Sequence, residues 1–391
     1  MTGVARIAAE LIACRSENPP GETRDCAEYV RDRLEALGLR TVIAGETPER
    51  ANAVANGRSA DLLLCGHLDV VPALGETWSF DPFGGEVRDG YVLGRGATDM
   101  KGGCAALIAA VRGAVERGVD VSRIGLAFVC DEETGGGGIG HLLGAGLLSP
   151  CDCLIAEPTP AGAPCIGQKG LLRARFRFRG EPGHASLYPE RGVSAVMEAV
   201  ALIEYVRRLY ERVHDPGPEL APVIADSERV LEAAFDAPGT GAVLRRITYN
   251  PGRIEGGEKA NIVAERCELE LDLRLPWGCD PAALAAELRA HAPRAEMECM
   301  SASAPSCTPP GERIVSRIAA AVGAVRGTPA VPIVQWAASD ARALRLAGFP
   351  TVEYGPGELA RIHAVDERVP VSSLEEAVAV YGRLIDAYAR P

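Results

Sequence analysis

An imidazole and several carboxylates stand at the ends of apolar runs in the first half of the chain. His67 and Asp69 follow one run, Glu132-Glu133 follow a second, and Glu157 ends a third. Asp99 stands in a glycine-rich turn ahead of a helical stretch. Carboxylates crowded together repel one another unless cations neutralise them, and mixed histidine and carboxylate ligands suit Zn, Co or Mn. These residues therefore predict a centre of two divalent metal ions, with zinc as the first expectation.

The elements that must position these residues alternate between strand and helix. Continuous apolar runs at 62–65, 124–130 and 153–156 are typical of strands buried on both faces. Helical patterns cover 3–15 and 103–117. This alternation predicts an α/β fold in which helices cover a mostly parallel sheet, and ligands of such sheets bind at the carboxyl ends of the strands. We therefore expect the metal centre at that edge of the sheet.

A second unit interrupts this pattern near residue 170. Apolar and charged residues alternate strictly over 172–179 and again over 268–275, as in half-exposed antiparallel strands. Helical stretches near 192–212 and 281–291 accompany them. We interpret this region as an inserted α+β domain. The expected ranges are 1–171 and 284–391 for the catalytic domain and 172–283 for the insertion.

The composition is that of a globular protein, since 47% of the 391 residues are hydrophobic and 24% are charged. A net charge of −12 disfavours a nucleic-acid or anionic-membrane partner, and we expect no segment that spans a bilayer. Twelve cysteines are scattered along the chain and do not have the dense spacing of a secreted disulfide scaffold. The first residues also lack the pattern of a signal peptide. We therefore expect a cytoplasmic protein with reduced thiols.

One glycine motif has the form of a nucleotide-binding site, but the negative charges beside it argue against nucleotide binding. Gly135, Gly137 and Gly140 have the spacing of a dinucleotide fingerprint and follow a predicted strand. Glu132-Glu133 directly precede this motif, so a pyrophosphate would meet two negative charges. The close pair Cys151-Asp152-Cys153 is by itself too weak a signal to predict a metal site.

Three motifs together resemble the M20 metallopeptidase and deacylase family. They are His67-Leu68-Asp69-Val70-Val71-Pro72, Gly94-Arg95-Gly96-Ala97-Thr98-Asp99-Met100-Lys101-Gly102 and Asp131-Glu132-Glu133-Thr134-Gly135. Ser339-Asp340-Ala341-Arg342 and His363 extend the resemblance, in order, over nearly the whole chain. The family includes acetylornithine deacetylase, succinyl-diaminopimelate desuccinylase, aminoacylase-1 and carboxypeptidase G2. The resemblance implies a metal-dependent amidohydrolase whose inserted domain serves as a lid and dimerisation unit.

The resemblance also assigns roles at the metal centre. It implies that His67 and Glu157 bind one ion, that Glu133 and His363 bind the other, and that Asp99 bridges the two ions.

Two further carboxylates receive roles outside the metal ligands. Asp69 is expected to orient the His67 imidazole, because it stands two residues on along the same strand face. Glu132 is expected to be the general base, which takes a proton from water and passes it to the leaving amine. The family also implies a cis peptide bond between Asp99 and Met100.

The inserted domain carries three more residues that the resemblance marks. His184, in Pro182-Gly183-His184-Ala185-Ser186, is expected to steady the oxyanion in the site of a partner subunit. Asn261 and Arg274 are expected to bind the substrate, and the forked donors of Arg274 suit a carboxylate. Arg253 and Arg342 are weaker candidates. The resemblance therefore also implies a homodimer formed through the lid. The layout of the inserted domain predicts hinges near 169–172 and 276–283.

The substrate class is less sharply specified. Desuccinylases of the family carry Arg-Arg-Gly-Ser at the entry to the lid, where this chain has Gln168-Lys169-Gly170-Leu171. The loss of the arginine and the hydroxyl favours a small neutral acyl group, such as acetyl or formyl, on an amino acid. The alternatives are a di- or carboxypeptidase of the same family, hydrolysis of a non-peptide amide, and an inactive binding protein on the same fold.

Overall fold

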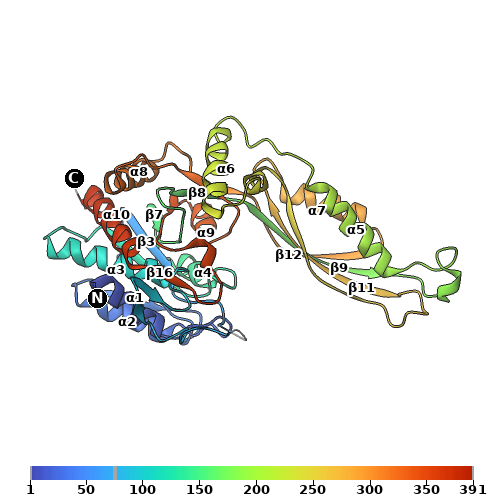
Figure 1. The fold of residues 1–391 in the computed structure, drawn as a ribbon, viewed down its shortest axis with the longest axis horizontal. Coiled ribbons are helices and arrows are strands. Elements are labelled where there is room, and N and C mark those ends of the chain that lie inside the picture. Colours follow the sequence, from blue (N-terminus) through green and yellow to red (C-terminus); the bar gives the residue numbers. More distant parts are fainter. Residues whose placement is uncertain (1, 74–76, 390–391) are drawn as a thin grey trace.

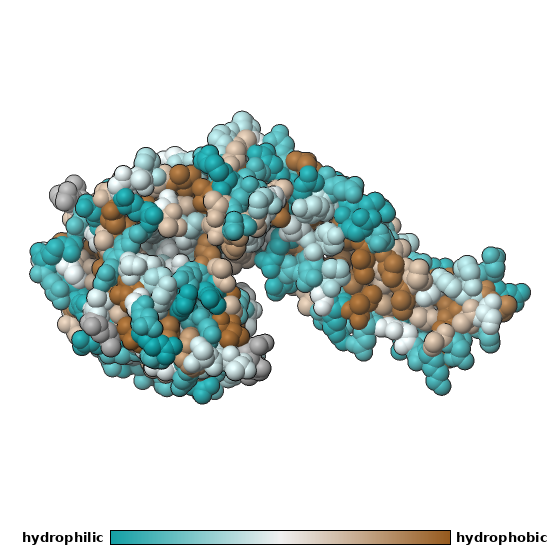
Figure 2. All heavy atoms as spheres, viewed as in Figure 1, coloured by the Kyte–Doolittle hydropathy of each residue, from teal (hydrophilic) through white to brown (hydrophobic). Residues whose placement is uncertain are grey.

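The computed structural model describes residues 2–73 and 77–389, which form two units of different shape (Figure 1). One is a thick body built around a large sheet, and the other is an elongated arm, built on a four-stranded sheet, that projects from it. An open notch separates the lower part of the arm from the body in the view of Figure 2. We call the arm the lid. In the described part of the chain, every helix is too short or too polar to cross a membrane.

The chain forms the following elements. The helices are α1 (Gly3–Ala13), α2 (Arg24–Glu35), α3 (Lys101–Glu116), α4 (Gly137–Gly144), α5 (Ala195–Leu209), α6 (Ala221–Phe235), α7 (Pro281–His291), α8 (Arg313–Arg326), α9 (Ala341–Leu346) and α10 (Val371–Ala389), with short 3-10 turns η1 (Ala185–Leu187), η2 (Thr240–Arg245) and η3 (Leu359–Arg361). The strands are β1 (Thr41–Ala44), β2 (Asn52–Ala55), β3 (Leu62–His67), β4 (Val87–Arg88), β5 (Tyr91–Leu93), β6 (Ile124–Val129), β7 (Asp152–Ile155), β8 (Cys165–Gln168), β9 (Gly170–Arg179), β10 (Thr248–Gly256), β11 (Arg266–Leu275), β12 (Ala295–Ser303), β13 (Ser306–Cys307), β14 (Ile333–Gln335), β15 (Thr351–Glu353) and β16 (Arg368–Pro370).

The large sheet has the strand order β1-β2-β6-β3-β7-β15-β8-β13, with β14 beside β8. Its centre is parallel, because β6, β3, β7 and β15 all pair in that sense, and antiparallel strands are added at both edges. Every residue of β3 and β6 is buried, as the continuous apolar runs predict. The predicted α/β fold with a mostly parallel sheet is therefore confirmed.

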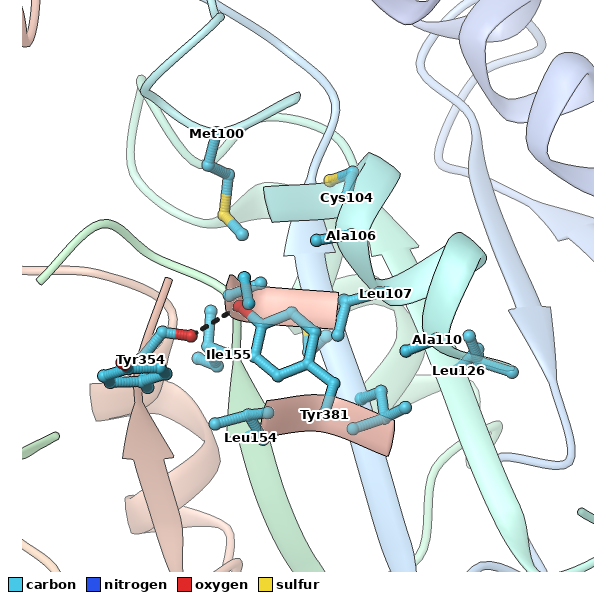
Figure 3. Packing of buried hydrophobic residues seen from close by; sticks show 14 of the residues in the cluster. Met100, Cys104, Ala106, Leu107, Ala110, Leu126, Leu154, Ile155, Tyr354 and Tyr381 are labelled. Atoms are coloured by element: carbon cyan, nitrogen blue, oxygen red, sulfur yellow. Dashed lines mark hydrogen bonds between the residues drawn. The ribbon is translucent and has the colours of Figure 1, made fainter. Parts of the chain in front are cut away.

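Helices cover the faces of this sheet, and α3 and α10 pack together over one of them. Figure 3 shows Tyr381 of α10 enclosed by Leu107 and other apolar side chains, while its hydroxyl donates a 2.6 Å hydrogen bond to the carbonyl of Tyr354. Burying one large apolar side chain of this kind stabilises the fold by roughly 1.5–3 kcal/mol. The layer therefore holds the strand ends rigidly beneath the candidate site.

The lid sheet has the order β10-β11-β9-β12 and is antiparallel throughout. Apolar residues on one face pack against α5 and α7. The other face carries cross-strand ion pairs, such as Arg175 with Glu270 at 2.8 Å and Arg177 with Glu298 at 2.9 Å. This arrangement explains the strict alternation of apolar and charged residues in β9 and β11.

The lid does not coincide with the expected range 172–283. Helix α7 and strand β12 continue the lid to residue 303, because α7 packs on its core and β12 pairs with β9. Conversely, α6 leaves the lid and packs beside β14 and β8 of the body (Figure 1). Strand β12 is mostly exposed, so its sequence lacks the alternation that marks the other lid strands.

Candidate metal centre

Asp99 lies between two histidines. Its Oδ1 is 3.1 Å from Nε2 of His67, and its Oδ2 is 3.2 Å from Nε2 of His363. A second carboxylate accompanies each imidazole, since Glu157 is 3.6 Å from His67 and Glu133 is 3.2 Å from His363. The structure therefore brings together all five residues that the sequence predicts as metal ligands, with Asp99 in the middle.

The donor atoms fit a pair of divalent ions. The Nδ1 atom of His67 lies 2.8 Å from the carbonyl oxygen of Asp69, which can only accept, so Nδ1 donates and Nε2 is the atom that faces the carboxylates. Ligand atoms of His67, Asp99 and Glu133 lie within 4.8 Å of one another, as do those of His67, Glu132 and Glu157. Either group could hold a divalent ion, and His67 belongs to both.

The electrostatics point the same way. Burial, followed by the nearby charge of Asp99, raises the pKa of Glu157 well above its usual value. Burial opposes a charge on His67, but its hydrogen bond to Asp99 and the charge of Glu157 raise the pKa of the imidazole well above its usual value. Negative charge is therefore in excess at this edge of the sheet, as a cation site needs.

Each ligand comes from the end of a different element. His67 is the last residue of β3, and Glu157 follows β7 by two positions. Glu133 lies in the turn after β6, Asp99 in the turn before α3, and His363 in the loop between η3 and β16. The bond between Asp99 and Met100 is cis, as predicted.

Asp69 contacts both sides of the centre. Its carbonyl accepts from His67, while its carboxylate lies 3.7 Å from the same imidazole. The carboxylate accepts hydrogen bonds from the backbone N–H groups of Glu132 and Glu133 at 3.1 and 3.2 Å. Asp69 therefore contacts the backbone of the Glu132-Glu133 pair as well as the imidazole. The sequence predicts only the contact with the imidazole.

Asn18 is a further residue of the site that no sequence motif predicts. Its side-chain amide donates to Asp69 at 2.8 Å, to Asp131 at 2.9 Å and to Thr134 at 3.0 Å. Asn18 is 3% exposed and precedes two consecutive cis peptide bonds, Asn18-Pro19 and Pro19-Pro20. The only signal in the sequence is Asn18-Pro19-Pro20-Gly21, which predicts a turn and gives no sign of its partners.

Glu367 is a second such residue. It is fully buried, accepts from the backbone N–H groups of Thr98 and Asp99 at 2.9 and 3.1 Å, and pairs with Arg95 at 2.7 Å. These contacts fix the turn that presents Asp99. Glu367 follows His363 by four residues, but nothing in that spacing predicts a contact with a turn more than 260 residues earlier.

Glu132 shares a cavity of about 180 Å³ with the ligands. Burial, opposed in part by the charge of His67, raises its pKa well above the usual value. A general base is more effective when its pKa is raised from the ordinary carboxyl value in this direction. Glu132 is thus next to the candidate metal positions, where a general base is needed.

Two of the predicted lid residues, His184 and Asn261, lie outside the metal cavity. His184 and Asn261 are exposed and close to each other, because the backbone N–H of Ala185 donates to the carbonyl of Asn261 at 3.2 Å. His184 follows β9 and Asn261 lies between β10 and β11, and neither side chain is in the lining of that cavity. The structure therefore does not bring His184 or Asn261 into the cavity that holds Glu132.

Arg274 is nearer the body. It is held by Asp272 at 2.8 Å and lines a cavity of about 520 Å³ together with Thr248 and Trp336. Trp336-Ala337-Ala338 lines this cavity and the one that holds the metal ligands, so the two adjoin along that segment. Of the three predicted lid residues, Arg274 therefore lies next to the centre.

Comparisons with known proteins agree with this arrangement. A sequence profile of peptidase family M20/M25/M40 matches residues 63–387. A succinyl-diaminopimelate desuccinylase of Cereibacter sphaeroides is 34% identical, with 98% of each chain covered. The M20 family metallo-carboxypeptidase Sso-CP2 from Sulfolobus solfataricus has a similar structure, with a TM-score of 0.80, 20% identity and 100% of both chains covered.

A further solved structure has a similar fold. The Bacillus subtilis YxeP protein, described as a dinuclear metal binding peptidase from the M20 family, has a TM-score of 0.67 and 14% identity, with 98% of this chain and 97% of that chain covered. The chain described here belongs to peptidase family M20/M25/M40 and is a metal-dependent amidohydrolase.

Proposed function

We propose that the protein hydrolyses the amide bond of an N-acyl amino acid and uses two divalent ions, with zinc the first choice and Co or Mn as alternatives. The position of Asp99 between His67 and His363 is the observation that carries the proposal. Glu157 completes the ligands of one ion and Glu133 those of the other. When bound, the ions polarise the amide carbonyl and acidify a water molecule.

The side chains of the protein do the rest of the chemistry. Glu132 takes the proton of the attacking water and gives it to the leaving amine, for which its raised pKa is suited. Asp69 accepts hydrogen bonds from the His67 imidazole and from the backbone N–H of Glu132, and so fixes their positions relative to each other. Arg274 binds the carboxylate of the amino-acid part, because its cavity adjoins the metal centre and its guanidinium has the matching fork of donors.

The acyl group is small and uncharged in this proposal. Lys169 stands where desuccinylases of the family place an arginine, but its ammonium is buried within the chain. It donates to the carbonyls of Val243 and Arg246, both at 2.7 Å, and to the hydroxyl of Thr248 at 3.1 Å. With its donors used in this way, Lys169 does not bind a succinyl carboxylate.

A homodimer formed through the lid would supply the missing groups. We place His184 and Asn261 of a partner subunit over the metal centre, because in the same chain both lie away from it. Exposed apolar side chains near them, namely Leu187, Met197 and Ile262, offer a surface that a second copy would cover. Figure 2 shows apolar residues gathered on the lid in that view.

We also propose that the enzyme works in the cytoplasm, because its twelve cysteines, all among the described residues, are free thiols.

The experiment is a release assay for free amine on metal-loaded and chelator-treated protein. The substrates are N-acetyl, N-formyl and N-succinyl amino acids and several dipeptides. Chelator-sensitive hydrolysis of an N-acyl amino acid supports the proposal, and hydrolysis of dipeptides alone would replace it with a peptidase. Mixing Glu132→Gln and His184→Ala subunits tests the dimer, because mixed dimers regain one intact site and hence part of the activity.

A further inference from the structure

In the sequence, helix α6 lies between two elements of the lid, but in the structure it packs on the body. The chain leaves the lid after α5, forms α6 and η2 against the body, and returns to the lid at β10. Ile224 and Leu231 of α6 are buried in the core of the body. The buried hydroxyl of Ser227 accepts a 2.8 Å hydrogen bond from the backbone N–H of Val334, so the helix is fixed to β14.

The last two turns of α6 form a wall of the metal cavity. Leu231 and Phe235 line the same cavity as Asp99 and Glu132. The ring of Phe235 packs against that of Trp336, with centroids 5.3 Å apart. Leu359 and Ile362 also line the cavity, so apolar side chains make up part of its wall beside the carboxylates.

The charges in this cavity disfavour an anionic group. Its lining contains five carboxylates, and among the described residues it contains no lysine or arginine. Two bound divalent ions would neutralise these carboxylates without giving the cavity an excess of positive charge. A second carboxylate on the substrate would therefore face negative charge and an apolar wall without a cation to pair with.

The cation that suits a substrate carboxylate is Arg274, in the adjoining cavity. With the amino-acid carboxylate held there and the scissile carbonyl at the metal ligands, the part of the substrate that remains in the metal cavity is the acyl group. The volume of about 180 Å³ is small beside the roughly 300–1,000 Å³ of pockets that hold drug-sized ligands. Only a short acyl group fits.

We propose that α6 determines acyl specificity: Leu231 and Phe235 select a short, uncharged, apolar acyl group and discriminate against succinyl. This inference rests on the proposed deacylase function and adds the class of acyl group to it. Butanoyl and succinyl make the sharpest pair of probes, because both have four carbons and they differ in a terminal methyl against a terminal carboxylate. A hydrophobic pocket separates groups that differ by one methylene by roughly 10–200-fold.

The test compares kcat/KM for N-acetyl, N-butanoyl and N-succinyl derivatives of one amino acid. We expect the wild type to prefer butanoyl to succinyl by about tenfold or more. Phe235→Ala should lower kcat/KM for butanoyl relative to acetyl about tenfold, because the longer chain loses its contact with the ring, and Phe235→Arg should raise kcat/KM for succinyl relative to butanoyl by a similar factor. Phe235 is 37% exposed, so both variants are expected to fold, which their melting temperatures check.

Val223→Ala is the matched control, since Val223 lies on α6 outside the lining of this cavity and should leave both ratios unchanged. A wild type that prefers succinyl, or Phe235 variants whose ratios stay within about twofold of the wild type, would overturn the inference. Calorimetric binding of the butanoyl and succinyl compounds to metal-loaded Glu132→Gln gives a second readout. If the wild type hydrolyses none of the compounds, the proposed function fails, while the order of these binding constants still decides the role of α6.

Discussion

Asn18 and Asp69, which are 51 positions apart, are joined by a 2.8 Å hydrogen bond from the side-chain amide of one to the carboxylate of the other. The same carboxylate accepts from the backbone of Glu132 and Glu133. The Asn18 amide is thus linked through Asp69 to the proposed general base and to one proposed metal ligand, although it contacts neither side chain. The turn that holds Asn18 is consequently part of the machinery of the site.

Replacing Asn18 should therefore affect stability and activity together. In Asn18→Ala the carboxylates of Asp69 and Asp131 lose a shared donor, which should lower the free energy of unfolding by about 1–3 kcal/mol. The activity should fall as well, because the backbone of Glu132 loses its fixed acceptor. Asn250→Ala, an exposed change on the lid, is the control and should stay within about 0.5 kcal/mol of the wild type in urea unfolding.

Glu132→Gln removes the proposed base and preserves the size of the side chain. We expect the activity to fall by about 10²–10⁴-fold, which is the usual contribution of general acid–base catalysis. The five predicted ligands are unchanged, so the metal content should stay at that of the wild type. Activity assays and elemental analysis of the same preparation check both parts, and substantial residual turnover would show that another group is the base.

Removing the metal ions should destabilise the protein as well as inactivate it. Without cations, the carboxylates around His67 and Asp99 repel one another in a buried site. We expect chelator treatment to lower the melting temperature, and Zn, Co or Mn to restore both the temperature and the activity. A melting temperature that chelation leaves unchanged would argue against the predicted ligands.

The buried pair of Glu367 and Arg95 offers a second test of positioning. Glu367→Gln keeps the shape but removes the charge that faces Arg95, which should cost about 3 kcal/mol of unfolding free energy. It should also weaken metal binding, because Glu367 fixes the backbone of Asp99. Asp386→Asn breaks a partly exposed pair with Arg117 and should cost less than about 1 kcal/mol.

Lys169 should make stability depend on pH. Burial, followed by the charge of Arg274, lowers its pKa to about 7, whereas an unfolded lysine has a pKa of roughly 10.4. Between these values the unfolded chain binds the extra proton, so the contribution of Lys169 to stability should rise as the pH increases from 7 to about 10. Below pH 7 the full cost of the buried charge is present.

Denaturation of the wild type and Lys169→Met across this range measures the effect. The difference in unfolding free energy should move in favour of the wild type as the pH rises. Lys259→Met, an exposed change, controls for the loss of a lysine. A difference that stays constant from pH 7 to pH 10 would contradict the lowered pKa.

Much of the fold could be predicted because it depends on local patterns. The buried strands that lead to His67 and Glu132 are continuous apolar runs, and the lid strands β9 and β11 alternate strictly. The cluster of His67, Asp99 and the acidic residues could be predicted because residue type and position at strand ends and turns limit what they can do, whereas His363 was marked only by the family resemblance. The path of α6 could not be predicted, since its packing on β14 depends on a contact with Val334, more than 100 positions away.

Asn18 and Glu367 could not be predicted for a related reason. Each acts through hydrogen bonds to distant backbone or side-chain groups, and a single asparagine or glutamate carries no mark of such a partner. His184 shows the opposite case. Its motif is recognisable, but its distance from the metal cavity within one chain depends on the arrangement of lid and body.

Because α6 leaves the lid and lies against the body, one continuous stretch of sequence encodes both the proposed dimer surface and a wall of the acyl cavity. A recombination event that exchanged this stretch between relatives would transfer assembly and substrate choice as a single inherited unit. Insertions or drift within residues 213–247 would instead alter the acyl cavity while the metal ligands, encoded on either side, stayed as they are. A change of acyl specificity therefore needs substitutions only in a segment that contains none of the proposed catalytic residues.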